Sequence, residues 1–179
     1  MSRPLLDLGD GIEVRYLEPN DAEEMFGVID ANRDRLRAWM PWVDPTQGPA
    51  DTRAFIERVR ASGDEDGLGI FVDRSYVGGI GLRPDEVNGD AEIGYWIGAA
   101  HEGRGLVTRA CRALIDRAFG DLGLHRVTIR VAPDNARSRA IPERLGFREE
   151  GVMREAGASA FGHHDLVLYG LLDREWRSP

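Results

Sequence analysis

The sequence predicts a mixed α/β domain, with one sheet that carries helices on both of its faces. Short segments that alternate between apolar and polar residues, as strands do, are interleaved with segments whose apolar residues recur at helical spacing. Helix-start signals follow two of the central strand segments, as expected where strands and helices alternate along a chain. Because 179 residues suffice for one sizeable core, we expect a single domain over residues 1–179.

Each expected element rests on its own periodicity and end signals. The expected strands cover Gly11–Leu17, Leu68–Asp73, Tyr76–Pro84, Asp90–Gly98, Arg126–Ala132, Phe147–Glu155 and Leu166–Asp173. The expected helices run from Asn20 or Asp21 to about Ala31, over Arg35–Trp42, over Pro49–Ser62, from Gly105 to about Leu122, and over Arg137–Leu145. Pro41 is expected to stop the second helix, and Asn135 to cap the last. Gly157–Asp165 is expected to be a loop between the final two strands.

Composition and charge narrow the classes of function. The formal net charge of −8 disfavours nucleic-acid binding, which needs a basic face, and favours a cationic partner such as an amine. All 23 basic residues are Arg, so a Schiff-base lysine and a phosphate-loop lysine are both excluded. No apolar run approaches the ~20 residues of a membrane span. We therefore expect no membrane partner and a cytoplasmic location.

Metal and disulfide chemistry has little support in the sequence. Cys111 is the one cysteine, so neither a disulfide framework nor a multi-cysteine zinc site can form. Its place in an expected helix indicates a buried core residue, since unpaired cysteines are among the most buried residue types. His163, His164 and Asp165 are consecutive, but an expected surface loop explains them better than a metal site does. We expect no metal.

The segment His101–Thr108 (HEGRGLVT) follows an expected strand and opens an expected helix. Gly103 and Gly105 allow a tight turn and keep side chains out of the way of a ligand. The free N–H groups of the first helical turn, with the helix dipole behind them, suit an anion such as a pyrophosphate. A plain strand–helix turn is the alternative. Thr108 stands where a dinucleotide fingerprint needs Gly or Ala, which disfavours a Rossmann site.

A second segment, Asn135–Phe147, follows the next expected strand. Together with His101–Thr108 and Ala91–Trp96, it resembles GNAT N-acetyltransferases, most closely their RimJ/RimL-like branch, which acetylates N-termini of ribosomal proteins and related amines. The resemblance covers nearly the whole chain, from Leu36–Trp42 to Tyr169–Trp176. It implies the GNAT fold, a twisted mixed sheet of about six or seven strands whose parallel central strands splay apart, with helices on both faces.

The resemblance also implies where acetyl-CoA, the expected co-substrate, would bind. It would enter between Asp90–Gly98 and Arg126–Ala132, with its pantetheine chain pairing like an added strand. The residues expected to hold it are Trp96, Ile97, Gly98, Gly103, Arg104, Gly105, Leu106, Val107, Thr108, Asn135, Ser138, Arg139 and Arg144. Two alternatives stay open, since Asn135 can be a helix cap only and Arg144 can lie on a solvated helix face.

The same resemblance implies catalytic roles. Many GNAT enzymes use a tyrosine as general acid where this chain has Pro142, whereas the RimL-like branch uses the serine of an Asn-x-x-Ser pattern. That serine matches Ser138, which the resemblance therefore implies as the acid, with a helix-surface serine as its alternative. The glutamate base of RimL-like enzymes corresponds to Gly157, which leaves Glu155, two residues away, and Glu92 as candidate bases; a structural ion pair with an arginine is the alternative for Glu92, and a water chain can also carry the proton away. A backbone N–H near Ile97 is expected to stabilise the oxyanion.

The acceptor is less closely defined by the sequence. Trp39, Met40 and Trp42 are expected either to form one wall of the acceptor pocket or to pack in the core. A protein N-terminus and a small amine are the competing acceptors, each attacking directly in a ternary complex. A non-catalytic acyl-CoA-binding module is a third reading, because Pro142 and Gly157 lack side chains that relatives use. A homodimer, formed through a strand edge or the C-terminal region, is left open.

Overall fold

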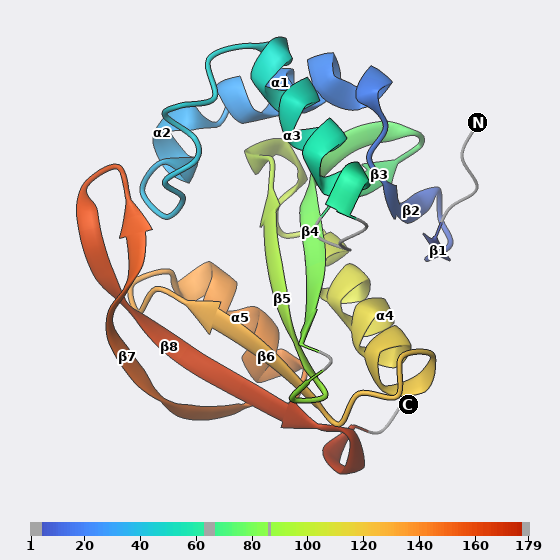
Figure 1. Cartoon of the computed structure of the whole chain (residues 1–179), viewed down its shortest axis with the longest axis vertical. Coiled ribbons are helices and arrows are strands. Elements are labelled where there is room, and N and C mark those ends of the chain that lie inside the picture. The colour runs from blue at the N-terminus through green and yellow to red at the C-terminus, as the bar shows by residue number, and fades with distance from the viewer. Residues whose placement is uncertain (1–4, 63–66, 86, 177–179) are drawn as a thin grey trace.

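The computed structural model describes residues 5–62, 67–85 and 87–176, and the rest of the expected domain lies outside the described residues. In the described part, one sheet holds eight strands in the order β1-β2-β3-β4-β5-β6-β8-β7, with helices on both sides (Figure 1). The predicted fold class is confirmed. The sheet is larger than the six or seven strands expected, partly because two residues near the N-terminus, β1, pair with the first predicted strand.

The eight strands are antiparallel to their neighbours except at the centre, where β5 and β6 run parallel. Their bounds are β1 Leu6–Asp7, β2 Ile12–Tyr16, β3 Leu68–Val72, β4 Ser75–Asp85, β5 Asp90–Ile97, β6 Arg126–Val131, β7 Arg148–Ser159 and β8 Gly162–Leu172. The α-helices are α1 Ala22–Asp30, α2 Arg33–Leu36, α3 Pro49–Ser62, α4 Leu106–Gly120 and α5 Ala136–Arg144. Short 3-10 turns cover Pro19–Asp21, Ala99–His101 and Asp173–Glu175.

The helix expected over Arg35–Trp42 is wrong in its bounds. α2 ends at Leu36, well before Pro41, and the chain continues as turns. The physical reason is a competing set of hydrogen bonds, because the Arg33 guanidinium donates to the carbonyls of Val43 (2.6 Å) and Thr46 (2.7 Å). These bonds draw the segment after α2 back onto the helix and stabilise a loop in place of a longer helix.

The loop expected over Gly157–Asp165 is also wrong. β7 and β8 extend into this segment, with Gly157 opposite His164 and Ser159 opposite Gly162, so only a short turn joins them. The register shifts between Met153 and Gly157, where Glu155 has a positive φ of 49°. Such a bulge interrupts the alternation that marks a strand, which is why the sequence pattern stops before the strand itself ends.

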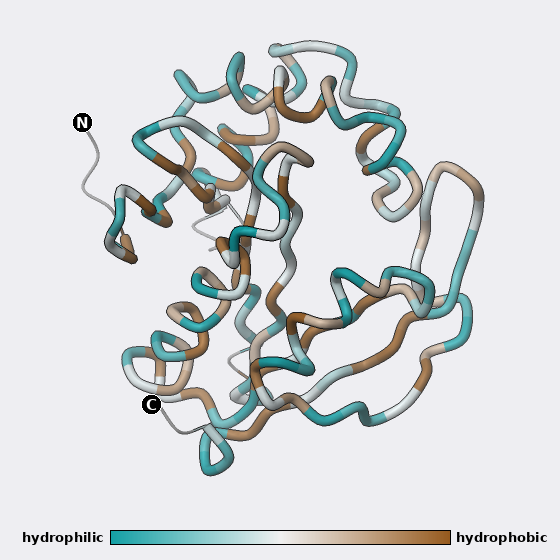
Figure 2. Tube along the Cα trace, turned by 180° about the vertical axis from the view of Figure 1, so that it is seen from behind, coloured by the Kyte–Doolittle hydropathy of each residue, from teal (hydrophilic) through white to brown (hydrophobic). Residues whose placement is uncertain are grey.

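Two apolar clusters cover the two faces of the sheet. The first packs α4 and α5 against the central strands and includes the buried residues Ile93, Cys111 and Leu114. The second lies under α1, α2 and α3 and includes Ile29 and Ile56. Figure 2 shows brown and teal alternating along α4, as expected for a helix with one face toward a core. Among the described helices, none combines the length and apolarity needed to cross a membrane.

Candidate active site

The central strands β5 and β6 pair only at one end, and beyond it they diverge (Figure 1). The parallel pairing joins Asp90–Glu92 to Arg126–Thr128, although β5 continues to Ile97. At the open end, the Gly98 N–H donates to the Val77 carbonyl at 2.8 Å, in the direction of β4. Because backbone groups of successive strand residues point to opposite edges, the N–H and C=O of Ile97 face the gap. This edge can pair with an added extended chain.

The first turn of α4 borders the gap with free backbone donors. Gly105 stands at the N-cap position with φ 72°, and no side chain caps the helix there. The first intrahelical bond runs from Arg109 N–H to the Gly105 carbonyl (3.0 Å), so the three amides of Leu106–Thr108 precede it without an intrahelical acceptor. A Cβ added at Gly103 or Gly105 would meet no heavy atom within 4 Å. The turn therefore has the open space, the donors and the dipole that a pyrophosphate needs.

Asn135 and Ser138 lie at the start of α5, across the gap from α4. The Asn135 side chain accepts from the Ser138 N–H at 3.2 Å, which confirms the predicted cap. The Ser138 backbone carbonyl accepts from the Tyr95 hydroxyl of β5 at 2.9 Å. Within residues 5–62, 67–85 and 87–176, the hydroxyl of Ser138 makes no hydrogen bond, so it is free to donate to a ligand. Its backbone is thus fixed from both sides while its side chain is unengaged.

We expect Tyr95→Phe to lower the free energy of unfolding by ~1–3 kcal/mol, because the Ser138 carbonyl would lose its buried donor. Burial raises the pKa of the Tyr95 hydroxyl, so it stays protonated and donates throughout the ordinary pH range. Urea denaturation of the parent and the variant measures the difference. Equal stability would show that this bond does not hold α5 against β5.

The predicted arginine contacts separate into two groups. Arg144 donates to the Thr108 hydroxyl (3.3 Å), which brings the C-terminal part of α5 to the first turn of α4. Arg139 instead faces β8 and β7, where it bonds the Tyr169 hydroxyl (2.8 Å) and pairs with Glu149 (3.2 Å). The structure therefore places Arg144 at the start of α4, where the phosphates are expected. Arg139 is instead bound to side chains of β7 and β8.

Glu92 lies at the closed end of the gap, between two guanidinium groups. Its Oε1 accepts from Arg83 at 2.7 Å, and its Oε2 pairs with Arg130 at 2.6 Å. Both oxygens are thus engaged, as the structural ion-pair alternative expects. Glu155, the other candidate base, is exposed in β7. At Gly157, a Cβ would lie 2.5 Å from the His164 Nε2, so a side chain there would require the His164 ring to move.

A cavity of about 560 Å³ lies beside β4 and β5 on the face that α1 and α3 cover. Met40 and Trp42, from the loop after α2, line it, and so does Trp96 of β5. Trp39, which belongs to the same described loop, does not line it. Of the three residues expected to form an acceptor wall, the structure therefore places two at the cavity.

Comparison with known protein families identifies the family to which this chain belongs. The model of the acetyltransferase (GNAT) domain matches residues 12–148. The chain belongs to the GNAT acetyltransferase family. Its resemblance to that family, inferred from Ala91–Trp96, His101–Thr108 and Asn135–Phe147, is thereby confirmed, and so is its class as an acetyltransferase.

Relatives of this GNAT chain cover nearly its whole length. A Bacillus subtilis (strain 168) protein named "Putative ribosomal N-acetyltransferase YdaF" is 42% identical over 177 residues, which cover 94% of this chain and 95% of that protein. The ribosomal-protein-serine acetyltransferase of Escherichia coli (strain K12) is 27% identical over 92% of this chain and 94% of that protein. The structure of the Microcin C7 self immunity acetyltransferase MccE in complex with acetyl-CoA and AMP has a TM-score of 0.85 at 30% identity, over 92% of this chain and 94% of that chain. These relatives agree with acetyl-CoA as the co-substrate of the GNAT fold.

One charged cluster at the mouth of the gap was not predicted from the sequence. Arg35 of α2 donates to the Ile97 carbonyl and pairs with Glu102 (2.6 Å), and Glu102 also pairs with Arg137 of α5. The Arg35 Nε is buried and has no partner among the described residues. These residues lie far apart in the chain and form no local motif, so only the tertiary structure reveals that a cation sits at the edge of β5.

The remaining reactive side chains of this GNAT domain are accounted for by packing. Cys111 is fully buried in α4, and burial raises the pKa of its thiol, so the predicted core role is confirmed. His163 and His164 lie in β8, opposite Ala158 and Gly157. In the part of the chain that the structure describes, no cluster of His, Cys, Asp and Glu has the composition of a metal site.

Proposed function

We propose that this chain is an acetyl-CoA-dependent N-acetyltransferase acting on a primary amine, and specifically on the α-amine of a protein N-terminus. One observation carries the proposal. The open first turn of α4, the N–H of Ile97 at the edge of β5 and the unengaged Ser138 hydroxyl border the same gap between β5 and β6. A relative of 30% identity was solved in complex with acetyl-CoA, which supports this gap as the place where acetyl-CoA binds.

Each residue at the gap then has a chemical role. Acetyl-CoA supplies an acetyl thioester, with its phosphates held by the amides of Leu106–Thr108. The Ile97 N–H donates to the thioester oxygen as negative charge develops there during direct attack by the neutral amine. Ser138 donates its hydroxyl proton to the departing thiolate and regains a proton, through water, from the amine nitrogen that has formed the new amide bond. Glu92 is held by Arg83 and Arg130, so the proposal lets the proton of the amine leave through water and does not require Glu92 as base.

The relatives support a protein N-terminus as the acceptor. The Bacillus subtilis relative is named for ribosomal N-acetylation, and the Escherichia coli relative is named for ribosomal-protein serine. A small-amine acceptor is the second candidate, because the relative solved with acetyl-CoA also holds AMP, a small molecule. We place the protein in the cytoplasm, where both acceptor classes and acetyl-CoA would be present.

Release of free thiol from acetyl-CoA, with the purified full chain, tests the proposed function. One panel contains peptides with different first residues, and the other contains small primary amines. We expect release that depends on peptide and a peptide product heavier by one acetyl group in mass spectrometry. Release with small amines only would transfer the assignment to a small-amine acetyltransferase. Binding of acetyl-CoA without release in either panel would favour the non-catalytic module.

A further inference from the structure

The cavity beside β4 and β5 is large, and its lining is mainly apolar, with charged side chains from Asp51, Arg58 and Arg83. Its volume of about 560 Å³ lies within the ~300–1,000 Å³ range of pockets that enclose ligands. Tryptophan and tyrosine rings meet in it, since the Trp96 ring lies 5.8 Å from that of Trp42 and 5.9 Å from that of Tyr76. Phe55 of α3 and Tyr95 of β5 add two more rings to the lining. Such walls favour a large apolar or planar group over a small polar one.

Glycines on the sheet keep the floor of this cavity open. Gly79, Gly81 and Gly94, from β4 and β5, all line it. A Cβ on Gly79 would lie 2.5 Å from the Trp96 Nε1, so glycine is what lets the indole lie across the neighbouring strand. The cavity is therefore deep because glycines line its floor. Its shape depends on the contact between the Trp96 indole and Gly79.

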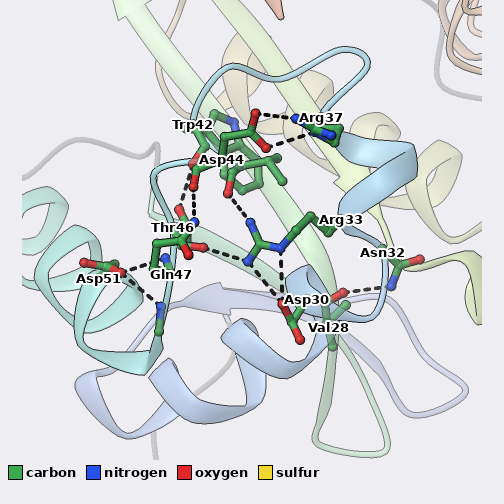
Figure 3. A network of polar contacts seen from close by, with 12 residues as sticks. Val28, Asp30, Asn32, Arg33, Arg37, Trp42, Asp44, Thr46, Gln47 and Asp51 are labelled. Atoms are coloured by element: carbon green, nitrogen blue, oxygen red, sulfur yellow. Dashed lines mark hydrogen bonds and ion pairs between the residues drawn. The ribbon is translucent and has the colours of Figure 1, made fainter. Parts of the chain in front are cut away.

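The outer wall of the cavity is held in place before any ligand binds. Figure 3 shows the polar contacts that fix the loop between α2 and α3, which carries Trp42. Arg33 donates to the carbonyls of Val43 and Thr46, Arg37 pairs with Asp44 (2.9 Å), and the Thr46 hydroxyl donates to the Trp42 carbonyl (2.7 Å). Because this wall is already ordered, little conformational entropy is lost when a ligand binds. Burial of a matching group therefore contributes more to the affinity than it would against a disordered loop.

A second, polar hollow shares one lining residue with the cavity. It lies around Glu92, Thr128 and Arg130, and Arg83 lines both hollows. β5 therefore passes three sites in order: the polar hollow at Glu92, the aromatic cavity at Trp96 and the backbone edge at Ile97. An acceptor that reaches all three needs an amine, an adjacent apolar group and a polar extension, which describes the N-terminus of a peptide.

We infer that the acceptor is a peptide N-terminus whose first side chain is large and apolar, such as Met, Phe or Trp, and that this side chain occupies the cavity walled by Trp42 and Trp96. This inference rests on the proposed function and narrows its substrate class. A first residue with a small side chain, Ala or Ser, would leave most of the cavity unfilled and its aromatic walls without contacts. Burial of a large apolar side chain corresponds to roughly a 10- to 100-fold gain in affinity over Ala.

Calorimetric titration of the full chain with CoA present tests this preference without requiring turnover. The peptides share one downstream sequence and differ only in the first residue: Met, Phe, Trp, Ala or Ser. We expect the Met, Phe and Trp peptides to bind roughly 10- to 100-fold more tightly than the Ala peptide. In the thiol-release assay, the same order should appear as lower KM values at similar kcat.

Two variants distinguish the effect of the cavity on peptide preference from general effects of losing a tryptophan on the fold. Trp42→Ala removes one wall and should abolish most of the preference, while the affinity for acetyl-CoA stays that of the parent. Trp176→Ala is the matched control, since Trp176 packs near α4, bonds Asp116 at 2.6 Å and does not line the cavity. This control should keep the preference in full. Thermal unfolding of both variants confirms that each is folded.

The results that would overturn this substrate preference differ from those that would overturn the proposed function. Turnover with equal or better use of Ala and Ser peptides would overturn the inference and leave the N-acetyltransferase intact. An unchanged preference in Trp42→Ala would also overturn it, because the cavity would then not be the discriminating site. Tight binding of free aromatic amines without any effect of the downstream peptide would overturn the peptide part. Failure of all thiol release, with the binding order retained, would count against the proposed function alone.

Discussion

Ser138→Ala is expected to lower kcat by ~10²–10⁴, the usual contribution of a positioned proton donor, with little change in the Kd for acetyl-CoA. The reason is that the structure separates the backbone of Ser138 from its side chain. Its N–H bonds Asn135 and its carbonyl accepts from Tyr95, and both contacts survive in alanine. Only the hydroxyl, which makes no hydrogen bond within the described residues, is lost. Steady-state kinetics with a saturating acceptor and fluorescence titration of acetyl-CoA measure the two quantities.

The control for Ser138→Ala is Ser75→Ala, an exposed serine at the hairpin between β3 and β4. It should leave both kcat and the Kd for acetyl-CoA unchanged. A proton donor also predicts that the loss depends on the leaving thiol, so an acyl donor whose thiol has a lower pKa should narrow the difference between parent and Ser138→Ala. If Ser138→Ala turned over at the parent rate, Ser138 would not be the acid and water would take that role.

Gly105→Trp is expected to raise the Kd for acetyl-CoA on the order of 100-fold or more, since each charge-assisted hydrogen bond to a phosphate contributes ~1.5–3 kcal/mol. The present turn leaves open space at Gly105, next to the free amides of Leu106–Thr108. An indole there would fill the space that the pyrophosphate needs. Equilibrium binding of acetyl-CoA, measured by calorimetry, gives the change directly.

The strain of the substitution needs its own control, because Gly105 has φ 72°, a value that costs other residues ~1–2 kcal/mol. Gly123→Trp provides it. Gly123 also has a positive φ (63°) and open space for a Cβ, but it lies beyond the other end of α4. Gly123→Trp should lose similar stability and keep the parent affinity. Equal affinities for acetyl-CoA in both variants would mean that the pyrophosphate does not bind at the start of α4.

The structure confirms two predicted features that depend on local sequence, the cap of α5 and the glycine turn before α4. Asn135 caps α5 as predicted, since a cap bond spans only three residues and its donor and acceptor are adjacent in the chain. The glycine turn before α4 was predictable for the same reason, because positive φ is a property of single residues. The alternation of Arg126–Ala132 identified β6 almost to the residue.

Predictions that needed more than local sequence were less exact. Strand ends at the β7 bulge were misplaced, because the three residues of β7 between Met153 and Gly157 lie opposite only Asp165 of β8 and the regular alternation is lost there. The predicted helix extended beyond the end of α2. The Arg33 side chain of α2 donates hydrogen bonds to the carbonyls of Val43 and Thr46, and these bonds hold the following segment as a loop. Neither feature is visible in a short window of sequence.

The sequence by itself determined the fold class, the family, the glycine turn before α4 and the Asn135 cap of α5. The reason is that periodicity, caps and glycine turns are set by residues within a few positions of one another. The tertiary structure decided which side chains meet. Only the tertiary structure shows that Arg35 donates to the Ile97 carbonyl. It also shows that Glu92 pairs with Arg83 and Arg130, and that Trp42 lines the cavity while Trp39 does not. These contacts join residues far apart in the chain, and their formation depends on strand order and register, which no local pattern contains.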